Sequence, residues 1–122
     1  MKLEIQSQDA RTAFEPGEDI VLVAHWELDS TIDALEARLV WFTQGKGTQD
    51  IGLAWRHRWD RPPLVGHEAI SVVLPEGPYT FSGSLISLSW RLELIMLPGD
   101  RGTHTQILIA PEGREVLLTQ VE

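Results

Sequence analysis

The residue types best suited to recognition chemistry are concentrated in residues 55–61, with the sequence Trp-Arg-His-Arg-Trp-Asp-Arg. This segment holds three of the ten basic residues and two of the five tryptophans of an acidic chain. Tryptophan and arginine are the side chains most enriched as anchors of protein interfaces. We therefore expect this segment to contact a protein partner. The candidate protein-binding residues are Arg56, Arg58, Trp59 and Arg61.

Two other roles fit residues 55–61. In the first, Trp55 and Trp59 belong to the core, while the arginines face water and pair with acidic residues on adjacent strands; strand alternation favours this role. In the second, exposed tryptophans form a flat platform that stacks against sugars, as in a carbohydrate-binding module. That role requires two coplanar, exposed indoles. A partner could also add a strand at an open sheet edge, which needs no special residue.

Catalytic and metal-binding motifs find little support in the sequence. The four histidines, at positions 25, 57, 67 and 104, form no His-x-His or His-Glu-x-x-His spacing. No Gly-x-Ser-x-Gly segment is present, and the glycine-rich residues 44–50 contain one lysine and no phosphate-loop pattern. We predict a non-enzymatic chain without catalytic, metal-binding or cofactor-binding residues. A small hydrolase or metal enzyme would need histidines and carboxylates to converge in a pocket.

Composition narrows the classes of partner and compartment. The net charge of −8 argues against a nucleic-acid-binding surface, which needs clustered lysine and arginine. With no cysteine, the chain has no disulfide and no thiolate chemistry, which fits a reducing compartment such as the cytoplasm. No apolar run is long enough to span a membrane, and residues 1–19 lack the apolar core of a signal peptide. The length of 122 residues fits one domain, residues 1–122.

The elements that must position these residues are strands. The longest regular pattern runs over residues 86–96, where apolar and polar residues alternate with a period of two, as in a half-buried strand. The apolar side of that strand holds Ile86, Leu88, Trp90, Leu92, Leu94 and Met96. Burial of six such side chains contributes about 9–18 kcal/mol before the entropy cost, as an upper bound. We expect this strand to lie at the centre of the fold.

About eight strands with turn signals between them are expected. They cover residues 3–5, 20–28, 34–43, 51–59, 65–74, 81–97, 106–110 and 115–119. In residues 51–59 the alternation places Leu53, Trp55, His57 and Trp59 on one face, and Ala54, Arg56 and Arg58 on the other. Residues 30–33 have the spacing of a helix capping box, which makes a helix the alternative for residues 34–43. The strand is favoured, because two glycines follow at once and the segment ends in strand formers.

Short strands at this spacing predict an all-β, antiparallel, immunoglobulin-like β-sandwich, with a closed barrel as the alternative. Residues 72–94 add a more specific pattern, because they resemble the arrestin-like domain. The matching features, in order, are Leu74-Pro75, Pro78, Thr80-Phe81, Gly83 and a strand with Ile86, Leu88 and Trp90. Pro16-Gly17-Glu18 before an apolar strand resembles the entry to the first sheet of that family.

The resemblance implies a β-sandwich that acts as an adaptor or scaffold through protein binding, without catalysis. Animal arrestins have two such domains and bind phosphorylated receptors, whereas this chain has the length of one. No cluster of basic residues matches a phosphate sensor, and no tail matches a coat-protein ligand, so receptor regulation does not follow. Prokaryotic single-domain arrestin-like proteins, such as those linked to sporulation control, are closer in size.

Overall fold

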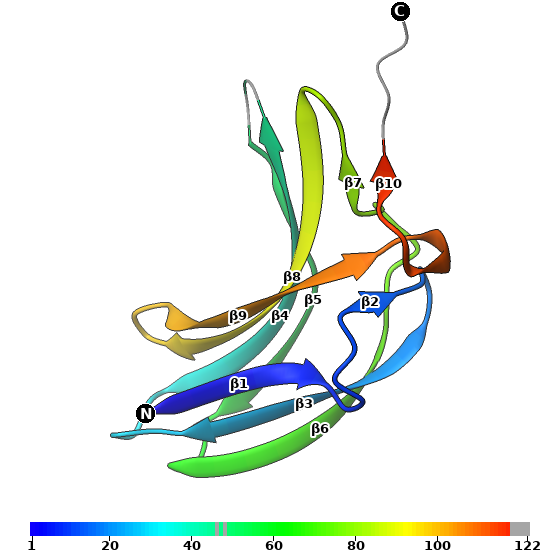
Figure 1. The fold of residues 1–122 in the computed structure, drawn as a ribbon. Helices are drawn as coiled ribbons and strands as arrows, with labels where there is room; N and C mark the ends of the chain where they lie inside the picture. The colour runs from blue at the N-terminus through cyan, green and yellow to red at the C-terminus, as the bar shows by residue number, and fades with distance from the viewer. Residues whose placement is uncertain (46, 48, 118–122) are drawn as a thin grey trace, which may run out of the picture.

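Two β-sheets packed face to face make up the computed structural model, which describes residues 1–45, 47 and 49–117. The smaller sheet has the order β1-β3-β6, and the larger sheet has the order β10-β7-β8-β4-β5 (Figure 1). In the larger sheet β9 also pairs with β8, and β2 pairs with β9. The long strands are β1 (Lys2–Ser7), β3 (Asp19–Glu27), β4 (Ala34–Gly45), β5 (Ile51–Asp60), β6 (Val65–Val73), β8 (Ile86–Leu97) and β9 (Arg101–Ile109). The short elements are β2 (Ala13–Phe14), β7 (Phe81–Ser82), β10 (Val116–Leu117) and the 3-10 turn Pro111–Gly113.

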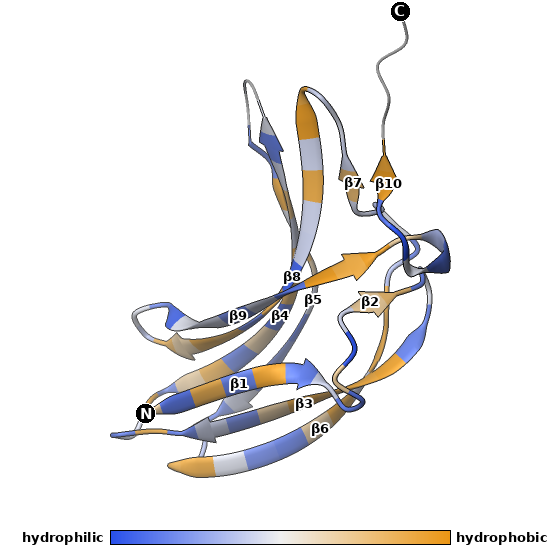
Figure 2. Ribbon diagram, viewed as in Figure 1, coloured by the Kyte–Doolittle hydropathy of each residue, from blue (hydrophilic) through white to orange (hydrophobic). Residues whose placement is uncertain are grey.

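The period-two pattern of residues 86–96 is confirmed as β8, which runs through the middle of the larger sheet between β4 and β9. Leu88, Trp90, Leu92, Leu94 and Met96 are all buried in the core between the sheets. Ile86 is the exception at 41% exposed. It lies where β8 extends beyond the smaller sheet, so no facing layer covers it (Figure 1). Figure 2 shows the same alternation as coloured bands along β1 and β8.

Residues 34–43 form a strand rather than a helix. β4 pairs with β8 on one side and with β5 on the other, so its backbone hydrogen bonds go to two neighbours. Leu35, Ala37 and Leu39 are fully buried in the core. Pairing on both sides stabilises the extended backbone more than a capping box stabilises an isolated helix, whose stability depends mainly on tertiary packing.

The smaller sheet has one close contact between a tryptophan and a glycine. Trp26 is 1% exposed, lies directly opposite Gly66, and donates a 3.0 Å hydrogen bond from Nε1 to the carbonyl of Pro63. A Cβ atom on Gly66 would lie 2.1 Å from Cζ2 of Trp26. Only glycine leaves room for this indole.

Gly66→Ala is therefore expected to lower the free energy of unfolding by about 1–3 kcal/mol, because overpacking forces a fixed side chain or the backbone to shift. Denaturant unfolding monitored by tryptophan fluorescence measures the change. Ser71→Ala, on the exposed side of the same strand, is the control and is expected to change stability by less than about 0.5 kcal/mol. Equal stabilities for the two variants would contradict this account of the Trp26 packing.

A β-bulge corrects one expectation about β5. Leu39 pairs with Trp55, but the next residue, Val40, pairs with Leu53, so Ala54 is an extra residue in the strand. Because of this extra residue, the side chains that precede Ala54 in β5 lie on the opposite face from the one that strict alternation predicts. Leu53 therefore faces away from the core at 51% exposed, and the prediction that it shares the face of Trp55 is wrong.

One short strand, β2, was not predicted, and the segment 81–97, expected as one strand, is divided into β7 and β8. β2 falls at the end of a segment expected to be polar and turn-like, yet Phe14 in it is 1% exposed. β2 pairs in parallel with β9, and β7 pairs in parallel with β10. The other strand pairs are antiparallel, as predicted. Part of the last expected strand, residues 118–119, lies outside the described residues.

The two sides of the sandwich differ. On one side β1 approaches β9, where the Thr105 hydroxyl donates a 3.2 Å hydrogen bond to the carbonyl of Ile5. On the opposite side β5 ends the larger sheet and β6 ends the smaller one, and neither pairs with a further strand among the described residues. The loop from β5 to β6 crosses between the sheets on this side (Figure 1). β5 is thus an open edge strand of ten residues.

Candidate functional site

Arg56 and Arg58 point to the outer face of the larger sheet, away from the smaller sheet. They lie opposite Arg38 and Glu36 of β4, whereas His57, the residue between them, lies opposite the core residue Ala37. Arg58 donates a 2.8 Å hydrogen bond from Nε to Asp60, which is the main cause that raises the pKa of Arg58. Arg56 makes no ion pair within the part of the chain that the structure describes.

Further charged residues from β4 and β8 extend this surface. The side chain of Glu36 is only 5% exposed and accepts a 2.9 Å hydrogen bond from Nε of Arg38. Nε of Arg91 lies 2.8 Å from Glu93 without good hydrogen-bond geometry, and its guanidinium lies over the ring of Phe42. We call this surface the arginine face; its arginines are Arg38, Arg56, Arg58 and Arg91. A depression of about 240 Å³ on it is lined by Glu36, Arg38, Val40, Ile51, Leu53, Arg56, Arg91 and Glu93.

The arginine face combines charge with apolar surface. Three of its arginines already lie beside carboxylates, in the pairs Arg38–Glu36, Arg91–Glu93 and Arg58–Asp60. Among the described residues this leaves Arg56 as the arginine of the face that can receive a new carboxylate. Ile51 and Leu53 are 72% and 51% exposed at the rim of the depression. An exposed aliphatic pair beside an unpaired arginine is typical of a protein-binding patch rather than of a catalytic centre.

The backbone of β5 adds hydrogen-bonding groups at the open edge. Arg61 donates a 2.8 Å hydrogen bond from N to the carbonyl of Asp33, and Thr43 donates one from N to Asp50. The backbone N–H and C=O groups of the odd-numbered residues of β4 therefore point to β5. Leu35 and Trp59, which lie opposite each other, form one such hydrogen-bonded pair. Because successive residues of a strand direct their backbone groups to opposite sides, the N–H and C=O groups of Arg56 and Arg58 point to the open edge.

Trp59 lies on the inner face, where it packs on the core. Its ring centroid is 5.3 Å from that of Trp26, and both it and Trp55 are half-buried. The Trp55 ring is inclined by 15° to the His57 ring, whereas the Trp59 ring is inclined by 70° to the same ring. The two indoles are therefore not coplanar and form no flat platform of the kind that stacks against sugars.

Arg61 follows the end of β5, with a positive φ of 46°. It shares a hollow of about 560 Å³ with Arg58, Asp33 and Asp60. The structure thus brings three of the four candidate residues together along β5 and its end, namely Arg56, Arg58 and Arg61. Trp59 lies on the opposite face of the strand and supports it from the core.

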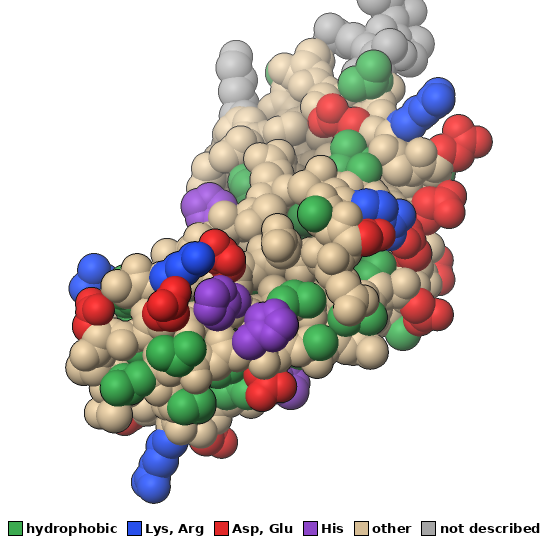
Figure 3. Space-filling view, turned by 60° about the horizontal axis from the view of Figure 1, so that its bottom comes forward, with side chains coloured by type: hydrophobic (Ala, Val, Ile, Leu, Met, Phe, Trp, Pro, Cys, Tyr) green, Lys and Arg blue, Asp and Glu red, His purple; other side chains and the backbone are tan. Residues whose placement is uncertain are grey.

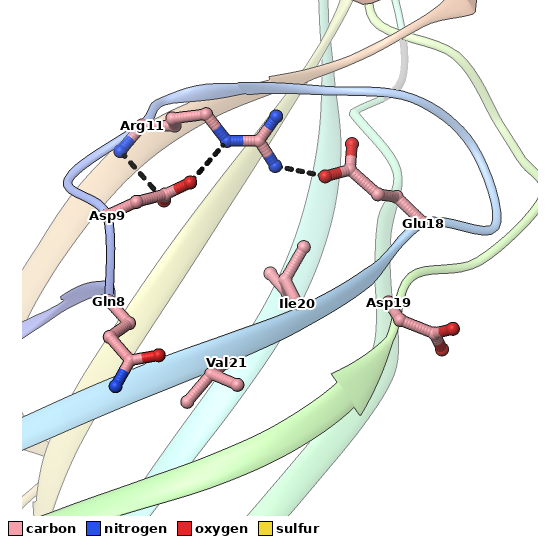
Figure 4. A pocket seen from close by; sticks show the side chains of 7 residues that line it. All are labelled: Gln8, Asp9, Arg11, Glu18, Asp19, Ile20 and Val21. Carbon is pink, nitrogen blue, oxygen red and sulfur yellow. Dashed lines mark hydrogen bonds and ion pairs between the residues drawn. The ribbon is translucent and has the colours of Figure 1, made fainter.

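A separate polar pocket of about 360 Å³ lies beside the β1–β3 connection (Figure 4). Arg11 occupies one wall, with Nε 2.9 Å from Asp9 and a second bond to Glu18, and it lies over the ring of Phe14. These ion pairs hold the β1–β3 connection against the start of β3. The charge of the Arg11 guanidinium is thus already balanced by carboxylates of the chain. This pairing indicates a structural role for the pocket.

The Ser7 hydroxyl lies 2.9 Å from Oδ1 of Asp9, and this contact is the main cause that holds the pKa of that carboxyl below its usual value. Ser7→Ala is expected to raise the pKa of Asp9, because the charged carboxylate loses a donor. Carboxyl-carbon NMR titration measures the shift, with Gln8→Ala as the control. An Asp9 pKa that stays low in Ser7→Ala would show that Ser7 is not the cause.

Within the described residues, no group of three or more His, Cys, Asp or Glu side chains could hold a metal ion. That part of the chain also contains no helix of the length and apolar character needed to cross a bilayer.

Sequence reasoning missed the contributions of β4 and β8 to the arginine face. The available signal was the spacing of Glu36 with Arg38 and of Arg91 with Glu93, since each pair shares one side of a strand. The spacing of residues within each strand does not show which residue of β4 lies opposite which residue of β8. In the structure Arg38 lies directly opposite Glu93, which joins the two pairs.

The fold defines an all-β sandwich of the arrestin-like class, which confirms the fold predicted from residues 72–94 and from the strand spacing. Among solved structures, the chain is similar to Spo0M, a sporulation control protein from Bacillus subtilis, with a TM-score of 0.61 and 16% sequence identity. The alignment covers 89% of this chain and 49% of Spo0M, so the chain spans about half the length of that protein. No protein-family model and no curated protein matches the chain.

Proposed function

We propose that this chain is a non-enzymatic protein-interaction module, an adaptor or scaffold, whose partner docks on the open edge of β5 and on the arginine face. The observation that carries the proposal is that the open backbone groups and the outward arginines belong to the same residues, Arg56 and Arg58. Arg61 extends the surface at the end of the strand.

Strand addition fits this edge. An extended segment of the partner would hydrogen-bond to the backbone of Arg56 and Arg58, and its outward side chains would lie directly beside theirs. A carboxylate beside Arg56 would pair with it directly, and one beside Arg58 would share that guanidinium with Asp60, so the expected partner segment is extended and acidic. A second copy of this chain fits poorly, because antiparallel pairing of two β5 edges would place arginines beside arginines.

Two further observations support a regulatory role for such a module and a location for it. Spo0M is described as a sporulation control protein, which is a regulatory role, and this chain has a similar fold over most of its length. The cysteine-free composition fits a reducing compartment, so we place the interaction in the cytoplasm.

Affinity capture from an extract of the native cell tests the proposal. The tagged chain is compared with Arg56→Glu/Arg58→Glu and with Arg101→Glu/Arg114→Glu, a control that makes the same change in net charge at exposed positions outside β5. We expect one protein to be captured by the wild type and by the control and to be lost with the β5 variant. Capture of the same protein by all three chains would place the partner elsewhere and contradict the proposal.

A further inference from the structure

The edge of the smaller sheet at β6 carries backbone groups that the proposed interaction does not use. Leu28 donates a 2.7 Å hydrogen bond from N to the carbonyl of Leu64, so the even-numbered residues of this segment bond to β3. Because successive residues direct their backbone groups to opposite sides, those of the odd-numbered residues 65–73 point to the open edge. Among the described residues, no strand pairs with them there.

The side chains along this edge do little to prevent pairing. The odd-numbered ones lie on the outer face of the sheet and are all exposed: Val65, His67, Ala69, Ser71 and Val73. Figure 3 shows the outer face of the smaller sheet, with histidine side chains side by side between acidic and apolar ones. β6 is nine residues long and contains no lysine or proline, the residues that most often protect an edge strand.

An added strand has room on both faces of the edge. Glu68 points to the inner side of β6, opposite the fully buried Ala24, yet it is exposed, so the larger sheet does not cover the middle of this strand. On the outer side, a depression of about 290 Å³ is lined in part by Val21, Ser71 and Val73. The two valines at the ends of the strand, Val65 and Val73, are 63% and 67% exposed.

We propose that a second copy of this chain pairs with β6 in the antiparallel direction, about a two-fold axis at Ala69. Two three-stranded sheets then become one continuous sheet. This register places Val65 opposite Val73 of the second copy, His67 opposite Ser71 of the second copy, and Ala69 opposite itself. It is the symmetric register that pairs all nine residues of β6, with about ten backbone hydrogen bonds, two for each odd-numbered pair.

The symmetry of the edge favours a second copy over an unrelated segment. Val65 of each copy meets Val73 of the other at the depression, so both ends of the pairing bury apolar surface. Two β5 edges would bring arginines together, whereas β6 contains neither lysine nor arginine. Its carboxylate, Glu68, lies opposite Ile70 of the second copy and diagonal to Glu68 of the second copy, which weakens the association.

The proposal does not depend on the proposed function, because it uses a different edge and no other protein. Its test uses the full chain alone, in analytical ultracentrifugation at chain concentrations from about 10 μM to about 1 mM. We expect the mass to rise from that of one chain to that of two. In amide exchange at the same concentrations, the odd-numbered amides of residues 65–73 should become protected, while the β5 edge stays fast.

A charge exchange at Ala69 tests the register. Ala69→Asp and Ala69→Lys are each expected to weaken self-association about fivefold, because like charges lie directly opposite each other across the axis. An equal mixture of the two variants should associate at least as tightly as the wild type. Gln6→Asp and Gln6→Lys make the same charge changes in the same row on β1 and should have no effect. Glu68→Gln is expected to strengthen the association.

Circular dichroism checks that each variant is folded, which is expected because Ala69 is exposed. The proposal is overturned if the wild type keeps the mass of one chain at about 1 mM. It is also overturned if a dimer forms but mixing the two Ala69 variants does not restore it. A dimer that is lost in Arg56→Glu/Arg58→Glu and kept in both Ala69 variants would place the contact on β5 and reject the β6 edge.

Discussion

A chain with alanine in place of Trp90 is expected to lose about 3–5 kcal/mol of free energy of unfolding. Trp90 is fully buried at the centre of β8, and its Nε1 donates a 2.7 Å hydrogen bond to the carbonyl of Pro78. Its removal leaves a cavity between the sheets and an acceptor without its donor. Since small domains are stable by only about 5–15 kcal/mol, this loss is a large fraction of the total.

Urea unfolding monitored by far-ultraviolet circular dichroism measures the loss. Trp90→Phe separates the two contributions, because it keeps most of the packing and removes the donor to Pro78; we expect a loss of about 1–3 kcal/mol. Ile86→Ala, at the exposed end of the same strand, is expected to cost less than 1 kcal/mol. A Trp90→Ala variant as stable as Ile86→Ala would refute the central position of β8.

The second large effect concerns binding. With the captured partner purified, Arg56→Glu/Arg58→Glu is expected to weaken its affinity by at least about 100-fold. The change replaces charge pairs at the interface with repulsion, and loss of one desolvated charge pair alone costs about 2–5 kcal/mol. Isothermal titration calorimetry measures the affinity, and higher salt is expected to weaken the wild-type complex.

Arg56→Lys/Arg58→Lys is the matched control for charge. It keeps the positive charge but loses the bidentate geometry of guanidinium, so an intermediate loss is expected. The double lysine variant should unfold at wild-type denaturant concentrations, because Arg56 and Arg58 are exposed. The double glutamate variant places a carboxylate opposite Glu36, so a lower stability is expected and its folded state is checked by the same unfolding measurement. An unchanged affinity of the double glutamate variant for the partner would show that Arg56 and Arg58 do not belong to the interface.

The long strands were predictable because each carries its own signal. A strand between two layers must alternate, and the alternation from Leu88 to Met96 places that segment in the sheet with no knowledge of its neighbours. The segment around Thr80-Phe81, which resembles the arrestin-like domain, indicated the class of sandwich. In the structure the buried Thr80 hydroxyl accepts a 3.0 Å hydrogen bond from N of Ile109, which joins this segment to β9.

Features that depend on pairing between strands were not predictable. The bulge at Ala54 is defined by the β4 register, so alternation alone placed Leu53 on the wrong face. The pairing of His25 with His67 was not predictable for the same reason, because the spacing of residues within a strand does not show which strands become neighbours. The two-residue strands are too short to show any period.

The candidate site was predictable only in part. Alternation correctly separates Arg56 and Arg58 from Trp59, and it indicated that the tryptophans belong to the core. That these arginines lie on an open edge follows from strand order, which the sequence does not encode locally. Their role in binding stays a prediction.

Amide hydrogen exchange of the chain, alone and with the captured partner, tests the central claim most directly. The open-edge amides of Arg56 and Arg58 have no acceptor among the described strands and should exchange fast in the free chain. Strand addition gives each of them an acceptor, so the account predicts strong protection of these two amides in the complex. Protection confined to β1 or β6, with the β5 edge still exchanging fast, would contradict it.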